Sequence, residues 1–326
     1  MRVLVTGGAG YVGSHAAKLL AESGHDVVIV DNMAEGHRPS VGQLPLVTAD
    51  LLDRELIVAA LRDHKIEAVM HFAAFAYVGV SVREPATYYN NNIVGSLALL
   101  DAMRTAGVNR IVFSSSCATY GIPQRVPITE DHPQHPISPY GFTKLVIERA
   151  LADYSHAYGL GYAALRYFNA AGAAADGTLG EDHDPETHLI PLILQVALGQ
   201  REYVEIFGTD YPTPDGTCIR DYIHVDDLAT AHVAALEKLE PGMELKLNLG
   251  TGRGASVQEV IDVCRVITGH PIPTRAAPRR EGDAPELVAD PSAAKRTLNW
   301  QPRYTMREIV ETAWVWHKKH PRGYGD

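Results

Sequence analysis

A glycine-rich segment near the N-terminus constrains the fold of this 326-residue chain more than any other feature. Residues 3–6 form a short apolar run, the sequence Gly7-Gly8-Ala9-Gly10-Tyr11-Val12-Gly13 follows, and residues with helical periodicity come next. Glycines at a strand-to-helix turn let backbone amides approach a pyrophosphate, which the helix N-terminus also attracts. The segment predicts a dinucleotide-binding turn, with contacts from Gly7, Gly10, Tyr11, Val12 and Gly13.

An acidic residue at the end of the next apolar run supports this interpretation. Asp31 follows residues 27–30 and lies 18 positions beyond Gly13, where a carboxylate can accept hydrogen bonds from the adenosine ribose. A carboxylate there repels a 2′-phosphate, and no Arg or Lys lies between Asp31 and Arg38. We therefore expect NAD rather than NADP, although an Asp at this place can also simply cap a turn.

Apolar runs and helical segments alternate through the first half of the chain. The runs cover residues 3–6, 27–30, 68–72 and 111–114, and the helix candidates cover 14–22, 53–64, 87–106 and 140–158. This alternation predicts an α/β fold, a Rossmann-type doubly wound parallel sheet covered on both faces. Past Arg166 a turn rich in Gly and Ala (169–177) is followed by an acidic loop that contains His (180–188). We therefore expect a cofactor domain over residues 1–175 and a smaller α/β substrate domain over 176–326, and some segments of the second should pack back on the first.

The composition limits the binding partners to be expected and indicates the cellular compartment. A formal net charge of −10 argues against a broad cationic face for nucleic acid. Three widely spaced cysteines suggest neither a disulfide framework nor a zinc site. The N-terminus lacks the apolar core of a signal peptide, and no stretch approaches the roughly 20 apolar residues that span a bilayer. We expect a cytoplasmic protein that binds neither nucleic acid nor membrane.

A tyrosine and a lysine mark the expected chemical centre. Tyr140 and Lys144 stand four residues apart at a helix start, so both project from one face. A nearby ammonium favours the phenolate and lowers the pKa of a tyrosine from its usual value near 10. Such a pair alone more often marks a helix surface. However, Ser114 to Ser116 end the fourth run at the carboxyl edge of the sheet, and the Ser116 hydroxyl either shares a substrate proton with Tyr140 or bonds its own backbone.

Further pieces of the chain match the motifs of a known family in one order. They are Asp31-Asn32, Asp50-Leu51, His71-Phe72-Ala73-Ala74 and residues 88–92, 114–116, 166–169, 217–224 and 279–283. With the glycine-rich turn and the Tyr140 and Lys144 pair, these pieces resemble the extended short-chain dehydrogenases and, within them, the UDP-glucose 4-epimerase family, along nearly the whole chain.

The resemblance implies a reversible oxidation at the sugar. Tyr140 would remove the proton of the 4-hydroxyl while hydride passes from C4 to NAD, and the 4-keto sugar would turn and take hydride back on its other face. Lys144 would also bond the nicotinamide ribose. UDP-glucose and UDP-galactose would thus interconvert, and Leu287, at a position that gates sugar size in the family, would admit UDP-N-acetyl sugars as well.

The resemblance also implies contacts. Those for the cofactor, beyond the glycine-rich turn, are Asp31, Asn32, Asp50, Leu51, Phe72, Ala73, Ala74, Asn91, Ser114, Tyr140, Lys144 and Tyr167. Those for the UDP-sugar are Ser116, Tyr140, Asn169, His188, Leu189, Phe207, Arg220, Arg280 and Asp283. Guanidinium groups suit a diphosphate, but Arg220 and Arg280 can instead form ion pairs with Asp221 and Asp283. Ala76 replaces the family's pyrophosphate-binding Lys, and His188 stands where some members have Asn.

Other functions remain open to different degrees. A nucleotide-sugar 4,6-dehydratase needs an Asp-Glu pair after the fourth strand, where this chain has Cys117-Ala118. Residues 116–121 also resemble 4-epimerases of UDP-arabinose and UDP-xylose, and UDP-glucuronate and UDP-galacturonate are a further alternative pair. A non-catalytic NAD-binding regulator would not need the Tyr140 and Lys144 pair.

Two further expectations concern metals and assembly. His183, Asp184, Glu186 and His188 have ligand chemistry, but their spacing fits no usual zinc motif, so we expect no metal. By resemblance we expect a homodimer. Its seam would use Leu97, Leu100, Met103, Ile147, Leu151 and Tyr154, unless these side chains face the sheet instead.

Overall fold

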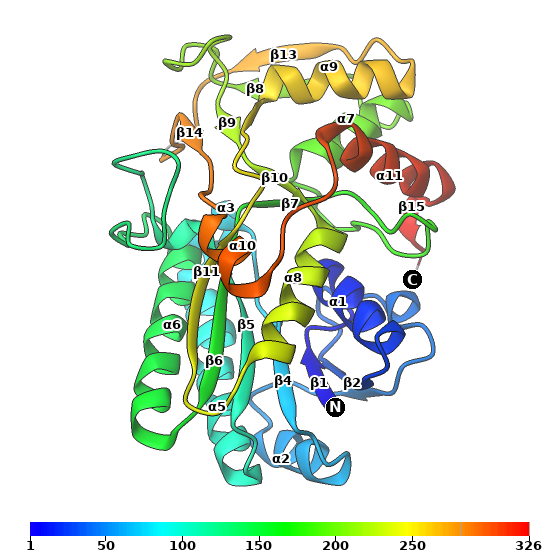
Figure 1. Ribbon diagram of the computed structural model, residues 1–326. Helices are drawn as coiled ribbons and strands as arrows, with labels where there is room; N and C mark the ends of the chain where they lie inside the picture. The colour runs from blue at the N-terminus through cyan, green and yellow to red at the C-terminus, as the bar shows by residue number, and fades with distance from the viewer. Residues whose placement is uncertain (281, 326) are drawn as a thin grey trace.

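A computed structural model describes residues 1–280 and 282–325 of the chain, so Glu281 of the matching segment 279–283 lies outside the described residues. A large layered α/β unit occupies one end of the molecule, and a smaller group of helices and short strands caps it (Figure 1). The two parts meet at the carboxyl ends of the large sheet, where the predicted site residues gather.

A seven-stranded parallel sheet forms the centre of the larger part, in the order β11-β6-β5-β4-β1-β2-β3. Its strands are β1 (Arg2–Thr6), β2 (Asp26–Asp31), β3 (Leu46–Thr48), β4 (Ala68–His71), β5 (Arg110–Ser116), β6 (Gly161–Tyr167) and β11 (Glu244–Leu249). The strand order reverses beside β1, which is the switch point where open α/β sheets bind their ligands. The predicted doubly wound Rossmann-type fold is confirmed.

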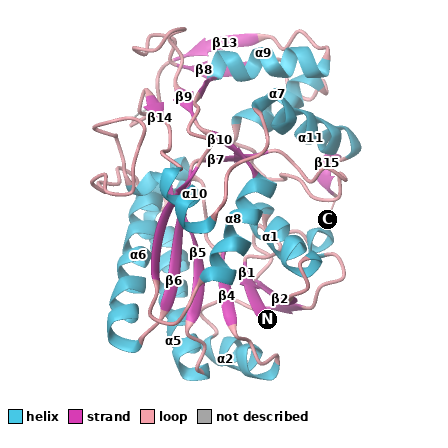
Figure 2. Ribbon diagram, in the orientation of Figure 1, coloured by secondary structure: helices cyan, strands magenta, loops and turns pink. Residues whose placement is uncertain are grey.

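Helices cover both faces of this sheet (Figure 2). One face carries α1 (Tyr11–Glu22), α8 (Val225–Lys238) and α10 (Ser292–Leu298), whose apolar side chains share a core with the sheet. The other face carries α2 (Arg54–Asp63), α5 (Gly95–Ala106) and α6 (Pro139–Tyr158). Both faces are dry, which explains why the strands read as continuous apolar runs rather than alternating ones.

The predicted helix at 87–106 is interrupted. It consists of α4 (Pro85–Tyr88), a π-helical segment η2 (Tyr89–Val94) and α5, and it follows the short α3 (Val78–Arg83). Single π-helical segments are frequent at functional sites, and this one carries Asn91 and Asn92 toward the centre described below. Short 3₁₀ turns also occur at Arg38–Val41 (η1) and Cys117–Thr119 (η3).

The smaller part has its own core. It contains α7 (Leu189–Ala197), α9 (Val257–Thr268), α11 (Met306–Lys319) and the parallel pair β8 (Val204–Phe207) and β13 (Thr274–Ala277). Short ladders link it to the sheet: β7 (Asn169–Ala171) with β10 (Tyr222–His224), and β9 (Ile219–Arg220) with β12 (Ala255–Ser256) and β14 (Glu286–Leu287). The strand β15 (Pro321–Tyr324) ends the described chain.

Segments from beyond the predicted boundary belong to the larger layer. β11 pairs with β6 from Glu244 opposite Tyr162 to Leu249 opposite Tyr167, and α8 packs against α1. The division near residue 175 stays a prediction, while the chain clearly returns to the first layer after it. Throughout residues 1–280 and 282–325, none of the helices combines the length and apolar character needed to cross a bilayer.

Candidate active site

The glycine-rich turn joins β1 to α1 and leaves no room for side chains at two positions. A Cβ on Gly7, which has a φ of 70°, would lie 2.4 Å from the backbone nitrogen of Ala73. A Cβ on Gly13 would lie 2.1 Å from the carbonyl oxygen of Gly7. Tyr11 and Val12 begin α1 directly after the N-cap Gly10, so the turn presents the amide end of a helix, as a pyrophosphate requires.

Carboxylates gather at the ends of the neighbouring strands. Asp31 ends β2, and its side chain accepts hydrogen bonds from the amides of Ala9 (3.0 Å) and Met33 (2.9 Å). Asn32 donates to Asp50 at 2.9 Å, and Leu51 follows Asp50 after β3. Asp31 therefore does brace the turn, as the structural alternative supposed, while remaining beside the glycines where an adenosine ribose would lie.

The remaining predicted cofactor residues line the same sheet edge. Phe72 and Ala73 directly follow β4, and their amides donate to the carbonyl of Thr6 at 2.9 and 3.1 Å, with Ala74 next along the chain. Asn91 donates to Asn92, which bonds both Phe75 and Thr143 of α6. Ser114 of β5 and Tyr167 of β6 share a hydrogen bond of 2.8 Å.

Tyr140 and Lys144 lie buried at the start of α6, with 8% and 3% of their surfaces exposed. Ser138 caps this helix through the amide of Gly141. The Lys144 ammonium donates to the Ser114 carbonyl at 2.8 Å and lies 5.7 Å from the Tyr140 ring centre. Ser116, at the end of β5, accepts the Ala118 amide at 3.1 Å. The three predicted catalytic residues are thus brought to one place.

The expected downward shift of the Tyr140 pKa is wrong for this structure. Burial raises the pKa of Tyr140 well above its usual value, and a hydrogen bond with Ser116 only partly opposes it. Burial also lowers the pKa of Lys144 to about 7, against the opposing charge of Glu148. Desolvation is the largest cause of both shifts, because burial disfavours the charged form of each group.

A buried polar network behind Tyr140 and Lys144 was missed from the sequence. Glu148, one helical turn beyond Lys144, pairs with Arg166 of β6, the shortest N–O distance being 2.6 Å. Glu148 also accepts from Ser115 at 2.5 Å, and Arg166 donates to the Tyr120 hydroxyl at 2.8 Å. The i, i+4 spacing from Lys144 was the available signal, but the partner on β6 has no local signature. This network fixes α6 against β5 and β6.

The predicted UDP contacts come from short elements above the sheet. Arg220 of β9 lies 3.2 Å from Asp283, so one of the anticipated ion pairs exists. Asp221 does not take the other: its carboxylate accepts from Thr251 and from the amide of Gly252. Arg280 lies over the ring of Phe207, its guanidinium carbon 4.0 Å from the ring centre. Both guanidinium groups and Phe207 therefore belong to one end of the smaller part.

Three other predicted substrate residues lie where the two parts meet. Asn169 begins β7, and its amide donates to the Asp221 carbonyl at 2.9 Å. Leu189 is the first residue of α7, and His188 is the N-cap residue before it. The His188 side chain makes a short contact with the buried Glu181 carboxylate. His188 is thus held by its own loop in this structure.

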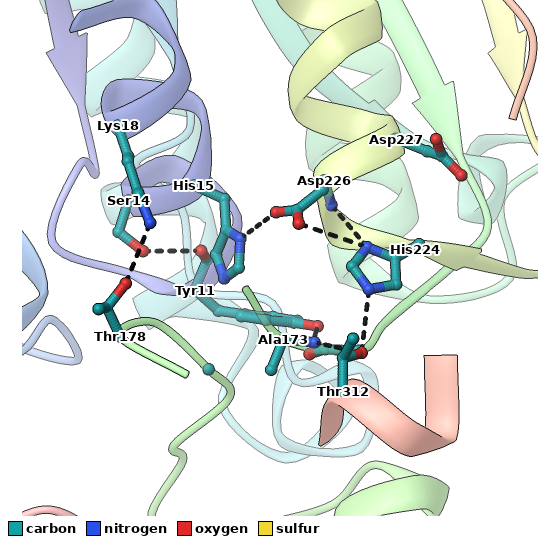
Figure 3. A network of polar contacts seen from close by, with 12 residues as sticks. Tyr11, Ser14, His15, Lys18, Ala173, Thr178, His224, Asp226, Asp227 and Thr312 are labelled. Atoms are coloured by element: carbon teal, nitrogen blue, oxygen red, sulfur yellow. Dashed lines mark hydrogen bonds and ion pairs between the residues drawn. The ribbon is translucent and has the colours of Figure 1, made fainter. Parts of the chain in front are cut away.

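A polar network ties the cofactor helix to the smaller part (Figure 3). His15 of α1 donates to Asp226 at 2.7 Å, and the Asp226 amide donates to Nδ1 of His224 at 3.0 Å. Because Nδ1 accepts, Nε2 of neutral His224 carries the proton toward Thr312 of α11, 3.0 Å away. Tyr11 completes the link by donating to the Gly172 carbonyl at 2.7 Å. The turn and the smaller part are therefore fixed relative to each other.

A glycine-rich Rossmann turn, a strand-ending Asp and a buried Tyr-x-x-x-Lys pair together define a nucleotide-dependent protein of the extended short-chain dehydrogenase class. The sequence model of the NAD dependent epimerase/dehydratase family matches residues 3–250. The chain belongs to this family. A Cβ on Gly10, the N-cap of α1, would have only the Gly7 carbonyl oxygen nearby, at 3.5 Å, so the helix N-terminus has the open space that a bound pyrophosphate needs.

Three similar proteins are named UDP-glucose 4-epimerases. A UDP-glucose 4-epimerase of Halalkalibacterium halodurans is 52% identical over 326 residues, covering 99% of this chain and 98% of the relative. The structure of UDP-glucose 4-epimerase from Brucella ovis in complex with NAD is 52% identical, with a TM-score of 0.93, and 96% and 97% of the two chains are covered. The Bifidobacterium longum UDP-glucose 4-epimerase in complex with NAD⁺ and UDP is 39% identical, with a TM-score of 0.95 over 99% and 100%.

Proposed function

We propose that this protein is an NAD-dependent 4-epimerase that interconverts UDP-glucose and UDP-galactose through a 4-keto intermediate. The observation that carries the proposal is the burial of Tyr140 and Lys144 together beside Ser116, at the sheet edge that the glycine-rich turn also faces. The similarity to enzymes named UDP-glucose 4-epimerase along the whole chain supports the choice of substrate.

Each group has a role in this proposal. Bound NAD supplies the acceptor for the hydrogen at sugar C4. Tyr140 acts as the phenolate, which the positive nicotinamide ring of bound NAD would favour against the effect of burial. It takes the proton of the 4-hydroxyl and returns it after the sugar has turned, and Ser116 shares that proton. Lys144, held by the Ser114 carbonyl, sets the charge beside Tyr140 and bonds the cofactor ribose. Their burial excludes water, so the keto sugar is not lost or hydrated before the reaction reverses.

The UDP contacts would hold the nucleotide while the sugar turns. Arg220 offers paired donors to a diphosphate once it exchanges Asp283 for phosphate, and Arg280 offers another set from above Phe207. Asn169 lies next to Arg220, since its amide donates to the Asp221 carbonyl, and the resemblance to the family adds Leu189 to the proposed contacts. Binding energy placed on the UDP portion leaves the reacting sugar free to rotate, which the inversion requires.

A substrate panel tests the proposal directly. Purified protein with NAD is incubated with UDP-galactose, UDP-N-acetylgalactosamine, UDP-xylose and UDP-glucuronate, and the products are identified by NMR. We expect UDP-glucose from UDP-galactose at the highest rate, and slower conversion of the N-acetyl sugar past Leu287. Efficient epimerisation of the pentose or uronate with none of UDP-galactose would replace the substrate assignment, and no epimerisation of any sugar would favour an NAD-binding regulator.

We further propose a cytoplasmic homodimer. Four of the six predicted seam residues face the sheet instead, because Leu100, Met103, Ile147 and Leu151 are buried in its core. The outer surface of the same helices still exposes apolar side chains at Val94, Leu97, Phe142 and Tyr89, which another copy of the chain would cover. Light scattering of the Leu97→Glu variant tests the pairing, and fractionation of the source cells tests the compartment, in which the three free cysteines fit a reducing environment.

A further inference from the structure

Four side chains of the loop that leads into α7 converge on one point. Glu181, His183, Glu186 and His188 each place one ligand atom within 4.8 Å of the others. Glu181 is almost completely buried, and the side chains of His183 and Glu186 are 17% and 6% exposed. The sequence singled out His183, Asp184, Glu186 and His188, whose spacing matched no metal motif. The folded loop instead groups three of them with Glu181, which was missed.

We propose that Glu181, His183, Glu186 and His188 bind a divalent transition-metal ion, with zinc the best match to two imidazoles and two carboxylates. A tetrahedral zinc site with bonds of about 2.1 Å places its ligand atoms about 3.4 Å apart. Nδ1 of His183 lies 3.4 Å from Oε1 of Glu181 and 3.6 Å from Oε2 of Glu186. Nδ1 of His188 makes a short hydrogen bond with the same Glu181 oxygen, so the half-exposed His188 ring would move outward to share an ion with it.

The state of His183 is an independent sign of a ligand. Its Nδ1 atom is fully buried and finds no hydrogen-bond partner anywhere in residues 1–280 and 282–325, although two carboxylates face it. Buried polar atoms without a partner are rare because they lose hydration and gain nothing in return. The Nδ1 atom of His183 is therefore available to a bound ion.

The charges also balance. Two carboxylates and two neutral imidazoles carry a charge of −2 together, which a divalent ion cancels. Four protein ligands leave no open position, as in structural zinc sites. The ion would therefore have a structural role and would take no part in the chemistry.

The position of the cluster shows which parts of the molecule the ion would stabilise. The His183 ring meets the rings of Tyr11 and Tyr77 edge-on, with centres 6.3 and 5.6 Å away. Tyr11 belongs to the glycine-rich turn, and His188 is the residue directly before α7. Because all four ligands come from residues 181–188, an ion here would hold that loop in one conformation, with the His183 ring against Tyr11 of the cofactor turn.

Metal content of the full-length protein tests this inference separately from epimerase activity. The protein is stripped with a chelator, dialysed, and titrated with zinc chloride by calorimetry, and bound metal is measured by mass spectrometry. We expect one zinc per chain in the wild type and its loss in His183→Ala and Glu186→Gln, with circular dichroism to show that each variant folds. The His270→Ala variant, which changes an exposed histidine outside the loop, should keep its zinc.

A cobalt-substituted wild type guards against variants that fail to fold. Cobalt bound by nitrogen and oxygen gives a visible absorption band without a thiolate charge-transfer band in the near ultraviolet. A thiolate band would assign the metal to a cysteine and overturn the proposal. So would a stripped wild type that takes up neither zinc, manganese nor iron, or a folded His183→Ala, Glu186→Gln double variant that keeps one equivalent.

Discussion

The Tyr140 and Lys144 centre and the residues proposed to hold UDP are built in opposite ways. Tyr140 and Lys144 stand on one 20-residue helix packed against a seven-stranded sheet, and both are buried. Arg220 is buried too but stands on a two-residue strand, Asp283 lies in a loop before another, and Arg280 is exposed. Groups that move a proton need a fixed geometry, whereas groups that grip a nucleotide can close on it as it arrives.

The largest effect should come from the smallest change in the rigid centre. Tyr140→Phe removes one oxygen, and we expect turnover of UDP-galactose to fall about 10²- to 10⁴-fold because proton transfer is lost. NAD content, measured after denaturing the protein, should not change. Tyr158→Phe, an exposed site on the same helix, serves as the control. If turnover by Tyr140→Phe stayed within about threefold of wild type, Tyr140 would not be the proton-transfer group, and the contrast between the two regions would be wrong.

The support of the rigid centre should show itself in stability. Glu148→Gln leaves the buried Arg166 without its carboxylate, and breaking a buried pair in this way costs about 3–5 kcal/mol of unfolding free energy. Urea denaturation measures it. The exposed pair of Arg149 and Asp153, 3.1 Å apart on the same helix, is the matched control, and Arg149→Gln should cost less than about 0.5 kcal/mol. Equal losses in both variants would mean that the network does not brace α6.

The UDP-binding residues should respond in binding rather than in chemistry. Arg220→Lys keeps the charge but loses the paired donors, so we expect KM for UDP-galactose to rise about tenfold, equivalent to about 1.4 kcal/mol. Turnover at saturation should stay within about twofold. The exposed Arg253→Lys variant should match wild type in both. If the Arg220→Lys enzyme instead lost turnover at an unchanged KM, Arg220 would act in the chemical step together with Tyr140 and Lys144.

The smallest expected effect concerns pH. Burial and the neighbouring Lys144 lower the pKa of His71 to about 3, and the ring lies between Thr6 and Ser96 at 2.7 Å from each. Because the folded pKa is below the unfolded value, the unfolded chain binds the extra proton between about pH 6.5 and 3, and stability falls as pH falls through that range.

A comparison of slopes measures this contribution. Between pH 6.5 and 5.5 the wild type should lose about 1 kcal/mol more unfolding free energy than His71→Gln, which cannot take up the proton. His270→Gln, at an exposed position, should follow the wild type. Identical slopes for wild type and His71→Gln would show that His71 charges freely, and that this side of the centre is wetter than its burial indicates.

Local spacing predicted the parts of the molecule that lie close together in sequence. The glycine-rich turn, the start of α6 and the doubly wound sheet followed from patterns within about 30 residues. Contacts between separate elements left no such pattern. Arg166 of β6 meets Glu148 of α6 only 18 residues away, but neither residue type indicates the other, and β11 reaches β6 from far along the chain. The predicted lowering of the Tyr140 pKa was wrong for a related reason. Burial sets this pKa, and burial depends on the whole fold rather than on a neighbour four residues away.

The late arrival of β11 has a consequence for how the chain is made. Six strands of the sheet end by Tyr167, but the seventh ends at Leu249. At about 5–20 residues per second, a ribosome needs on the order of ten seconds to add the intervening residues. Through that interval β6 is an open edge with unpaired backbone groups, which invite pairing with another nascent chain. Protection by chaperones should therefore matter most during this interval. A chain truncated near residue 175 would keep the β6 edge unpaired permanently.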